Sequence, residues 1–285
     1  MDSIEIIGAG SIIQHGTYNN RIYLMKLNPG DYPGIIPVME EKAAREGYGK
    51  ITAKVPASVY DGFVSSGYKK EAFIPRYFPD ETDLYFVSRF LDVKRAVDPR
   101  EERCDDVVST AISREKSSRP RSLQDPYSCR LLDDRDVQHI TEVYKQVFKT
   151  YPFPIFDCKY IKKTMKENLI YFGVFLDKKE LVSVSSTEMD MENKSVEMTD
   201  FSTLPEYRGN GFAACLLSRM EEEMDRMGIR TFYTIARSMS YGMNITFAKN
   251  SYIYSGRLVN NTNISGSIES MNIWYKIREH RNKSK

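Results

Sequence analysis

The 285-residue sequence predicts a mixed α/β (α+β) protein made of two parts, and three observations support this. Helix and strand patterns alternate throughout residues 129–285. A glycine-rich loop there joins a strand pattern to a strong helix pattern. A charged stretch poor in aromatic residues, residues 94–128, precedes it. We expect an N-terminal α/β domain at 1–93, a linker with one polar helix at 94–128, and a second domain at 129–285.

The second part predicts a central mixed sheet flanked by helices. A short strand at Ser128–Leu132 precedes an amphipathic helix from Asp133 to Phe148, which the prolines that follow Tyr151 break. Gly228 is typical of the residue that ends a helix in a left-handed turn. The other expected elements are a helix at 159–168, strands at 171–176, 180–188 and 195–204, a helix at 212–227, a strand at 231–236, a helix at 243–250, and strands at 255–260 and 269–275.

The first part contains a weak internal repeat of the second. The segment Met39–Gly47 matches Met220–Gly228 in helix pattern, charge placement and closing glycine. In both copies an apolar strand, a short helix and an aromatic strand follow. Chance likeness between two such units is the alternative. If the repeat is real, the N-terminal domain is a partial copy of the C-terminal fold without the glycine loop, and it serves structure or shapes the substrate site.

The composition excludes several function classes. The 41 basic and 39 acidic residues nearly cancel, so nothing points to nucleic acid or an anionic membrane. Mean hydropathy is −0.48, no apolar run approaches 18 residues, and no secretory signal pattern opens the chain. We therefore expect a cytoplasmic protein. The basic tail from Lys276 onward reads as a solvated end. The scattered histidines and cysteines suggest no metal site, and a homodimer stays open as an assembly state.

The loop Arg208-Gly-Asn-Gly-Phe-Ala213 carries the clearest chemical signal. Its two glycines remove side chains where backbone must approach a ligand closely. The free N–H groups of the next helical turn lie at the positive end of the helix dipole, which suits a pyrophosphate. Pro205 cannot continue a strand's hydrogen-bond ladder and favours a splay there.

Strand, Pro-x-Tyr-Arg-Gly-x-Gly and helix together resemble the acetyl-CoA signature of the GNAT N-acetyltransferase superfamily. The resemblance implies the GNAT fold for residues 129–285 and acetyl-CoA as co-substrate, without a metal. It places Phe247 where many members carry an acid tyrosine, and Ser240 where an asparagine often contacts the pantetheine. The implied acetyl-CoA-binding residues are Ser202, Thr203, Leu204, Arg208, Gly209, Asn210, Gly211, Phe212, Ala213, Ser240, Asn244 and Phe247.

An amine nucleophile needs a base, because a lysine-type ammonium has a pKa of about 10.4, roughly three units above neutral pH. The strand 195–204 offers Glu197 as the first candidate base, and Asp200 and Glu188 are the other candidates. Glu197 lies where many superfamily members carry the general base, although most strand glutamates are surface carboxylates. Because Phe247 cannot donate a proton, the acid is open among Tyr252, Tyr241 and water.

A finer resemblance covers most of the chain. The segments 236–249, 260–266 and 269–276 are similar to those of the beta-lysine N6-acetyltransferases, which also carry an extra N-terminal domain. That family makes N6-acetyl-beta-lysine, an osmolyte of salt stress. An acetyltransferase for another amine or a protein lysine, and a non-catalytic acetyl-CoA-binding module, are the alternatives. The expected substrate-binding residues are Tyr151, Phe153, Phe156, Glu188, Asn260, Asn261 and Asn263, although asparagines in turns often serve the backbone.

Overall fold

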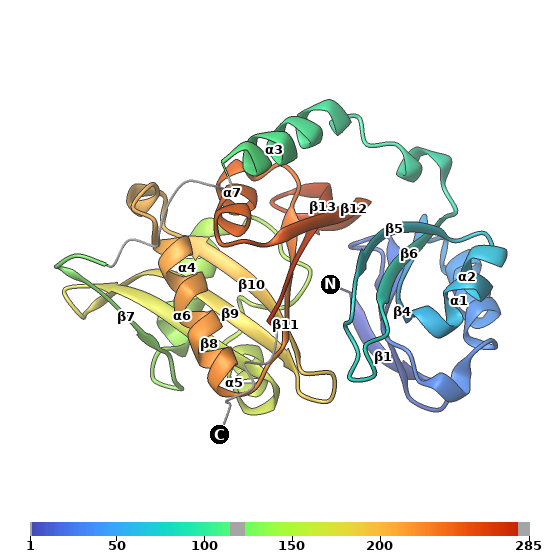
Figure 1. Ribbon diagram of the computed structural model, residues 1–285, viewed down its shortest axis with the longest axis horizontal. Coiled ribbons are helices and arrows are strands. Elements are labelled where there is room, and N and C mark those ends of the chain that lie inside the picture. Colours follow the sequence, from blue (N-terminus) through green and yellow to red (C-terminus); the bar gives the residue numbers. More distant parts are fainter. Residues whose placement is uncertain (1, 115–122, 279–285) are drawn as a thin grey trace, which may run out of the picture.

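Two mixed sheets form the frame of the protein in the computed structural model, which describes residues 2–114 and 123–278. Figure 1 shows the two sheets side by side, each with helices of its own. Residues 115–122 of the expected linker and residues 279–285 of the basic tail lie outside the described residues. No helix of the described part is both long and apolar enough to cross a bilayer.

The amino-terminal sheet has helices on one face only. Its strand order is β1-β2-β3-β4-β6-β5. Helices α1 and α2 cover the face turned away from the other sheet (Figure 1). Along β3 and β4, alternate residues such as Ile22 and Ala53 belong to the core under these helices, and intervening residues such as Tyr23 and Lys54 line a cavity on the opposite face. The elements are β1 (Ser3–Ile7), β2 (Ser11–Gly16), β3 (Arg21–Lys26), the 3-10 turn η1 (Pro29–Asp31), α1 (Ile35–Glu46), β4 (Lys50–Pro56), α2 (Ala57–Ser65), β5 (Lys69–Ile74) and β6 (Leu84–Phe90).

The carboxy-terminal sheet is covered on both faces. Its strand order is β12-β13-β11-β10-β9-β8-β7, with α6 and α7 packed on one face and α4 and α5 on the other. The elements are β7 (Tyr127–Leu131), α4 (Val137–Val147), α5 (Cys158–Glu167), β8 (Leu169–Leu176), β9 (Glu180–Asp190), β10 (Ser195–Thr203), η3 (Pro205–Tyr207), α6 (Phe212–Arg226), β11 (Thr231–Arg237), α7 (Tyr241–Lys249), β12 (Ile253–Ile264) and β13 (Ser267–Ile277).

The two sheets share one topology. The order β1-β2-β3-β4-β6-β5 matches β8-β9-β10-β11-β13-β12, and the central pairs β3–β4 and β10–β11 are the parallel pairs in each. The crossover helices α1 and α6 join these pairs, and 3-10 turns precede both. The repeat expected from residues 39–47 and 220–228 thus extends to the whole amino-terminal sheet.

The loop before α1 differs from the loop before α6 because its own side chains fill it. The Asp31 carboxylate accepts hydrogen bonds from the Ala9 N–H at 2.6 Å and the Ser11 hydroxyl at 2.6 Å. The Tyr32 ring stacks on Phe63, and its hydroxyl lies only 1.8 Å from where a side chain at Gly62 would begin. The loop before α1 is therefore not an open anion-binding turn like the one before α6.

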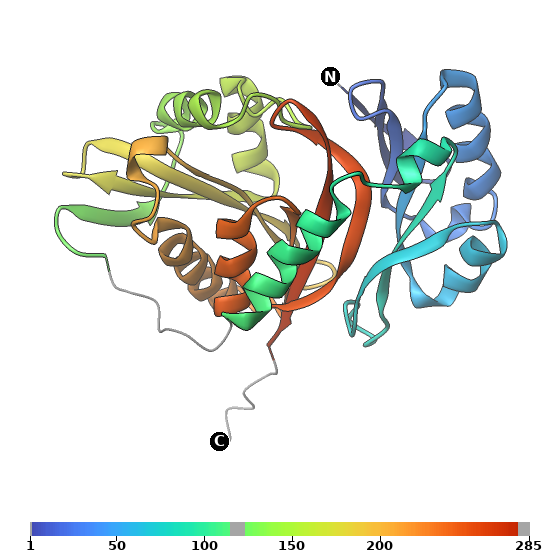
Figure 2. The same cartoon turned by 90° about the horizontal axis from the view of Figure 1, so that it is seen from above.

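Hydrogen bonds between the sheets fix the amino-terminal sheet over the other. Lys50 donates to the Val259 carbonyl at 2.8 Å while it pairs with Glu71 at 2.8 Å, and both side chains are buried. Gly256 of β12 packs so closely on β5 that a Cβ there would lie 2.1 Å from the Glu71 carbonyl oxygen. The linking helix α3 (Glu101–Ser113) lies against α7, as Figures 1 and 2 both show.

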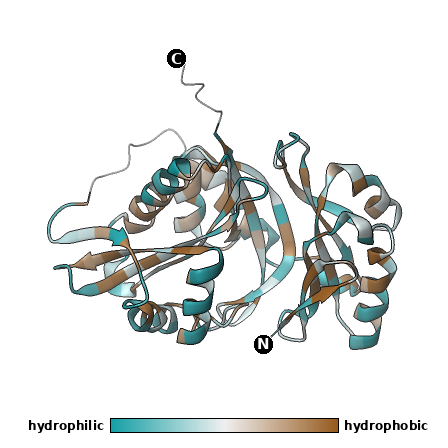
Figure 3. Cartoon of the chain, turned by 90° about the horizontal axis from the view of Figure 1, so that it is seen from below, coloured by the Kyte–Doolittle hydropathy of each residue, from teal (hydrophilic) through white to brown (hydrophobic). Residues whose placement is uncertain are grey.

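Most predicted elements appear within a few residues of their expected bounds. The helix expected from Asp133 begins at Val137 instead, because the Asp136 carboxylate accepts the Asp133 N–H at 3.0 Å and pairs with Arg130 at 2.7 Å. Those contacts hold residues 133–136 in a turn. The polar helix expected between residues 94 and 128 is α3, whose inner side is buried. Figure 3 shows apolar stretches in the strands of both sheets and a mixture of apolar and polar stretches along the helices.

Candidate active site

One cavity of about 670 Å³ joins the glycine loop to the space between the two sheets. Its lining comes from β9, β10, β11, the start of α6 and α7, and the connection after α4. Residues Arg21, Tyr23, Met25 and Lys54 of the amino-terminal sheet complete the wall. A volume of this size suits a small-molecule site.

The glycine loop supplies free backbone donors at the start of α6. Gly209 and Gly211 have φ values of 88° and 79°, and a Cβ at either position would meet nothing within 4 Å. Only glycine adopts this left-handed conformation without strain. No side chain caps the helix, whose first bond in this turn is Cys215 N–H to the Gly211 carbonyl at 3.1 Å. The N–H groups of residues 212–214 therefore lack intrahelical acceptors and can bind an anion.

A β-bulge opens the sheet beside this loop. Strands β10 and β11 pair only from Ser195 to Glu197, and the register of β10 against β9 shifts between Thr199 and Ser202. Asp200 lies in the bulge with a φ of 57°. Bulges bend a strand and end its pairing. The splay predicted at Pro205 therefore begins earlier, inside β10, and leaves room between the two strands for an extended ligand.

Two glutamates face each other across β9 and β10 on the cavity wall. Glu188 and Glu197 are direct cross-strand partners, an arrangement in which like charges are destabilising. Burial, and next the negative charge of Glu188, raise the pKa of Glu197 to about 8. Burial also raises the pKa of Glu188. The pKa of Glu197 therefore lies close to neutral pH, which favours proton transfer.

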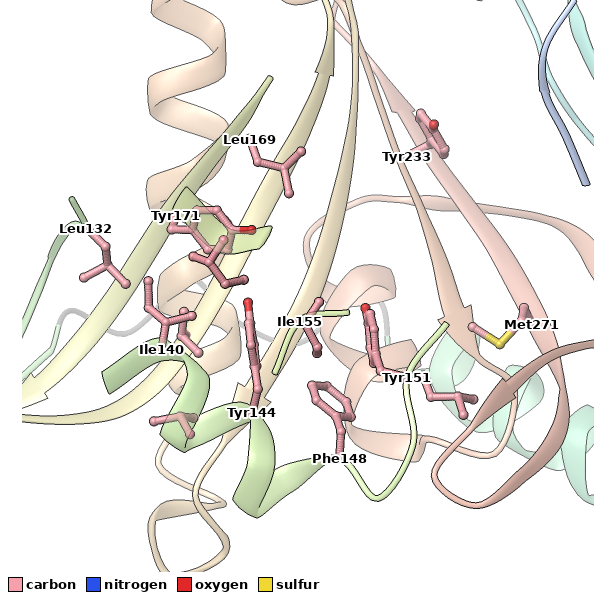
Figure 4. Close-up of a cluster of buried hydrophobic side chains, with 14 of the residues drawn as sticks. Leu132, Ile140, Tyr144, Phe148, Tyr151, Ile155, Leu169, Tyr171, Tyr233 and Met271 are labelled. Carbon is pink, nitrogen blue, oxygen red and sulfur yellow. The ribbon is translucent and has the colours of Figure 1, made fainter. Parts of the chain in front are cut away.

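Asp200 is bound by hydroxyl groups. Its carboxylate accepts hydrogen bonds from the Tyr151 hydroxyl and from the Ser186 hydroxyl at 2.5 Å. Figure 4 shows Tyr151 beside Phe148 and Tyr144, and the ring centroids of Phe148 and Tyr151 lie 4.8 Å apart. Burial raises the pKa of Asp200. With both oxygens occupied, Asp200 orients Tyr151 on the cavity wall and is less available than Glu197 to accept a proton.

The amino-terminal sheet contributes two cations to the cavity. Lys54 makes no hydrogen bond or ion pair with the described residues, and its ammonium lies 5.9 Å from the Tyr23 ring centroid. Burial alone would lower the pKa of Lys54, but the surrounding tyrosines and the two facing glutamates raise it above its ordinary value. Arg21 also lies close to Tyr23, with its guanidinium 5.1 Å from the ring centroid.

Most of the residues expected from the sequence line this cavity. Among the catalytic candidates these are Glu197 and Asp200. The others are Ser202, Thr203, Arg208, Gly209, Gly211, Phe212, Ala213, Ser240, Phe247, Tyr151, Phe153, Glu188 and Asn261.

Besides Asn260 and Asn263, five expected residues lie outside the cavity lining. The ring of Tyr252 packs edge-on against Phe247, 5.1 Å between centroids, behind the cavity wall. The Asn244 amide is used within the fold, because it donates to the Arg237 and Ser240 carbonyls and accepts from Trp274 at 2.8 Å. The cavity lining also lacks Leu204, Asn210 and Phe156. The Asn210 amide donates to the Tyr207 carbonyl at 2.9 Å, and Phe156 packs against the apolar core.

Two of the three expected asparagines bind backbone carbonyls of the amino-terminal part instead of lining the cavity. Asn260 donates to the carbonyls of Arg95 and Val97 at 3.1 and 2.9 Å. Asn263 donates to the Tyr18 carbonyl at 3.0 Å. Asn261 does line the cavity, but its amide oxygen accepts a hydrogen bond from Thr52 at 3.1 Å.

Tyr241, the other acid candidate, points away from the site. Its hydroxyl donates to Asp106 on α3, and it is absent from the cavity lining. The described residues therefore offer no tyrosine of α7 or of the segment after it as a proton donor.

Comparisons with known proteins agree with this geometry. The Acetyltransferase (GNAT) family profile matches residues 137–240. The chain is 41% identical to the beta-lysine N(6)-acetyltransferase of Methanococcus maripaludis over 94% of this chain and 97% of that protein. The chain belongs to the GNAT family of N-acetyltransferases.

Two further GNAT relatives align over nearly their whole length. The N-acetyltransferase YodP of Bacillus subtilis is 31% identical over 97% of this chain and 99% of that protein. The beta-lysine N(6)-acetyltransferase of Methanosarcina mazei is 30% identical over 87% of this chain and 98% of that protein. The YodP alignment, at 97% of this chain, includes the amino-terminal sheet as well as the GNAT part. The chain is an N-acetyltransferase, and GNAT acetyltransferases take their acetyl group from acetyl-CoA.

Proposed function

We propose that this protein transfers an acetyl group from acetyl-CoA to the N6 amine of beta-lysine. The observation that carries the proposal is a cavity with glutamates on one wall and cations on the facing wall, in a chain that aligns with beta-lysine acetyltransferases over 94% and 87% of its length. The walls from β3 and β4 enclose the acceptor side, which suits a small molecule better than a lysine within a folded protein. An acetyltransferase for another small amine is the alternative that the same cavity permits.

The glycine loop is proposed to bind the coenzyme. The N–H groups of residues 212–214 would bind its pyrophosphate, and the exposed edges of β10 and β11 would pair with its pantetheine arm. Acetyl-CoA, when bound, supplies the acetyl group and the thiol leaving group. The free loop donors and the splayed strands fit such a molecule.

Glu197 is proposed as the general base. A primary ammonium with a pKa of about 10.4 needs on the order of 4–5 kcal/mol to lose its proton at pH 7. Glu197, with a pKa near 8, can accept that proton directly or through one water and leave a neutral amine. Asp200 and Tyr151, joined by a hydrogen bond, line the cavity together with Glu197. Phe247 has no proton to donate, so water is proposed to reprotonate the leaving group.

The family resemblance also suggests where the reaction takes place and what its product does in the cell. We propose that the reaction takes place in the cytoplasm and that its product serves as an osmolyte under salt stress. Deleting the gene should abolish N6-acetyl-beta-lysine and slow growth in high salt, and an unchanged pool of that metabolite would contradict the assignment.

The direct test is mass spectrometry of acetylated products. Purified protein is incubated with acetyl-CoA and equal concentrations of beta-lysine, lysine, spermidine and a lysine-containing peptide. We expect acetylation at N6 of beta-lysine at the highest kcat/KM. Preferred acetylation of spermidine or the peptide would refute the substrate, and acetyl-CoA hydrolysis without an acetylated amine would refute the transferase activity.

A further inference from the structure

Arg21 is a buried cation without a partner of opposite charge. Its side chain is only 3% exposed, and no carboxylate of the described residues forms an ion pair with it. Burial lowers its pKa to about 10, which still leaves the guanidinium charged at neutral pH. An unpaired buried charge is costly. The fold keeps this costly unpaired charge at Arg21, on the wall of the cavity.

The hydrogen bonds of Arg21 leave one edge of the guanidinium nearly free. Nη1 donates to the Asn261 carbonyl at 2.5 Å and to the Thr262 hydroxyl at 3.1 Å. Nη2 has a long bond of 3.3 Å to the Gln14 amide oxygen, and the buried Nε has no acceptor among the described residues. Nε and Nη2 form the edge that binds a carboxylate side-on with two parallel bonds.

The charges on the cavity walls are separated. Glu188 and Glu197 lie on the β9–β10 wall, and Lys54 is the cation that faces them. Arg21 lies opposite Lys50 in the β3–β4 register, nearer the start of β4 than Lys54, and it forms no ion pair with Glu188 or Glu197. A ligand with amines at one end and an acid at the other would place its amines toward the glutamates and its acid toward Arg21.

We infer that Arg21 binds the carboxylate of the acceptor and makes this enzyme select amines that carry an acid group. The inference rests on the proposed function and names the residue that distinguishes beta-lysine from a polyamine. It also gives the amino-terminal sheet a direct role, because β3 presents the group that completes the acceptor site.

Arg95 is a matched control. It too is buried, at 7% exposure. Within the described part of the chain it donates only to backbone carbonyls, and its Nε has no acceptor there. Unlike Arg21, it does not line the cavity. Arg21→Gln and Arg95→Gln therefore remove similar interface bonds, and only the first removes a charge from the site. Arg21→Lys keeps the charge without the planar fork.

The experiment compares beta-lysine with beta-lysine amide, which lacks the negative charge. For each enzyme we measure kcat/KM by acetylation and Kd by calorimetry without acetyl-CoA. We expect the wild type to prefer the acid by about 100-fold, as for a charged bidentate pair. Arg21→Gln should reduce this preference to less than about 3-fold, mainly by raising KM and Kd for the acid. Arg21→Lys should give an intermediate preference, and Arg95→Gln should keep the preference of the wild type.

The outcomes separate the inference from the proposed function. If the wild type acetylates neither compound, the proposed function fails, and the inference fails with it. If the wild type acetylates both equally, or Arg21→Gln keeps the preference for the acid, the inference alone is overturned. Equal loss of the preference in Arg21→Gln and Arg95→Gln would assign Arg21 a structural role only.

Discussion

Replacing Glu197 with glutamine removes the proposed base and changes the pH dependence of the reaction. In the wild type, kcat/KM should rise with pH up to the pKa of Glu197, about 8, and then level off, because the carboxylate accepts a proton only when ionised. In the variant, only substrate that is already neutral can react. The rising limb should therefore move toward the amine pKa of about 10.4.

The size of the defect follows from the two pKa values. At pH 7.5 about a quarter of Glu197 is ionised, whereas roughly one amine in 800 is neutral, which gives a defect of about 200-fold. At pH 9.5 the same arithmetic gives about 9-fold. The defect therefore shrinks as the pH rises.

The assay follows release of the thiol at saturating acetyl-CoA between pH 6.5 and 10. Melting temperatures serve as a control for folding, and the substitution preserves the shape of the side chain. A defect of constant size across this range, or an unchanged rising limb, would show that Glu197 is not the base.

Two neighbours of Glu197 should move its pKa in opposite directions. Glu188→Gln removes a like charge and should move the rising limb of the pH–rate profile to lower pH. Lys54→Met removes a cation and should move that limb to higher pH. Equal or absent shifts in the two profiles would contradict the proposed electrostatics. Gly256→Ala places a Cβ 2.1 Å from a backbone oxygen of β5 and should lower the free energy of unfolding by about 1–3 kcal/mol in a denaturant titration. Gly242→Ala, in open space on α7, should leave stability unchanged or slightly higher, and equal losses in both variants would refute the close-contact argument.

The glycine loop was predictable because its signal is local. A strand, two glycines and a helix follow one another within residues 195–227, so periodicity and loop composition predict both the elements and the chemistry. The repeat between the two parts was also visible in helix pattern and closing glycines. The observed strand orders extend it to a whole sheet.

The acceptor side was not predictable, because its residues come from distant parts of the chain. Arg21 and Lys54 lie more than 130 residues before Glu188, and nothing local distinguishes them from other basic strand residues. The asparagines near 260 were expected to bind substrate because amides suit that purpose. Two of them bind backbone carbonyls of the amino-terminal part, which a single sequence does not reveal. A regular alternation of strand residues likewise does not predict the bulge at Asp200.

Calorimetry with coenzyme A tests the central claim most directly: backbone N–H groups after Arg208 bind the coenzyme. Gly211→Val introduces a side chain at the loop, and Gly228→Val introduces the same strain at the other end of α6, where φ is 77°. We predict similar losses of melting temperature in both variants, at least about 100-fold weaker coenzyme binding for Gly211→Val, and binding within about 3-fold of the wild type for Gly228→Val. Binding by Gly211→Val that equals the wild type would contradict the account.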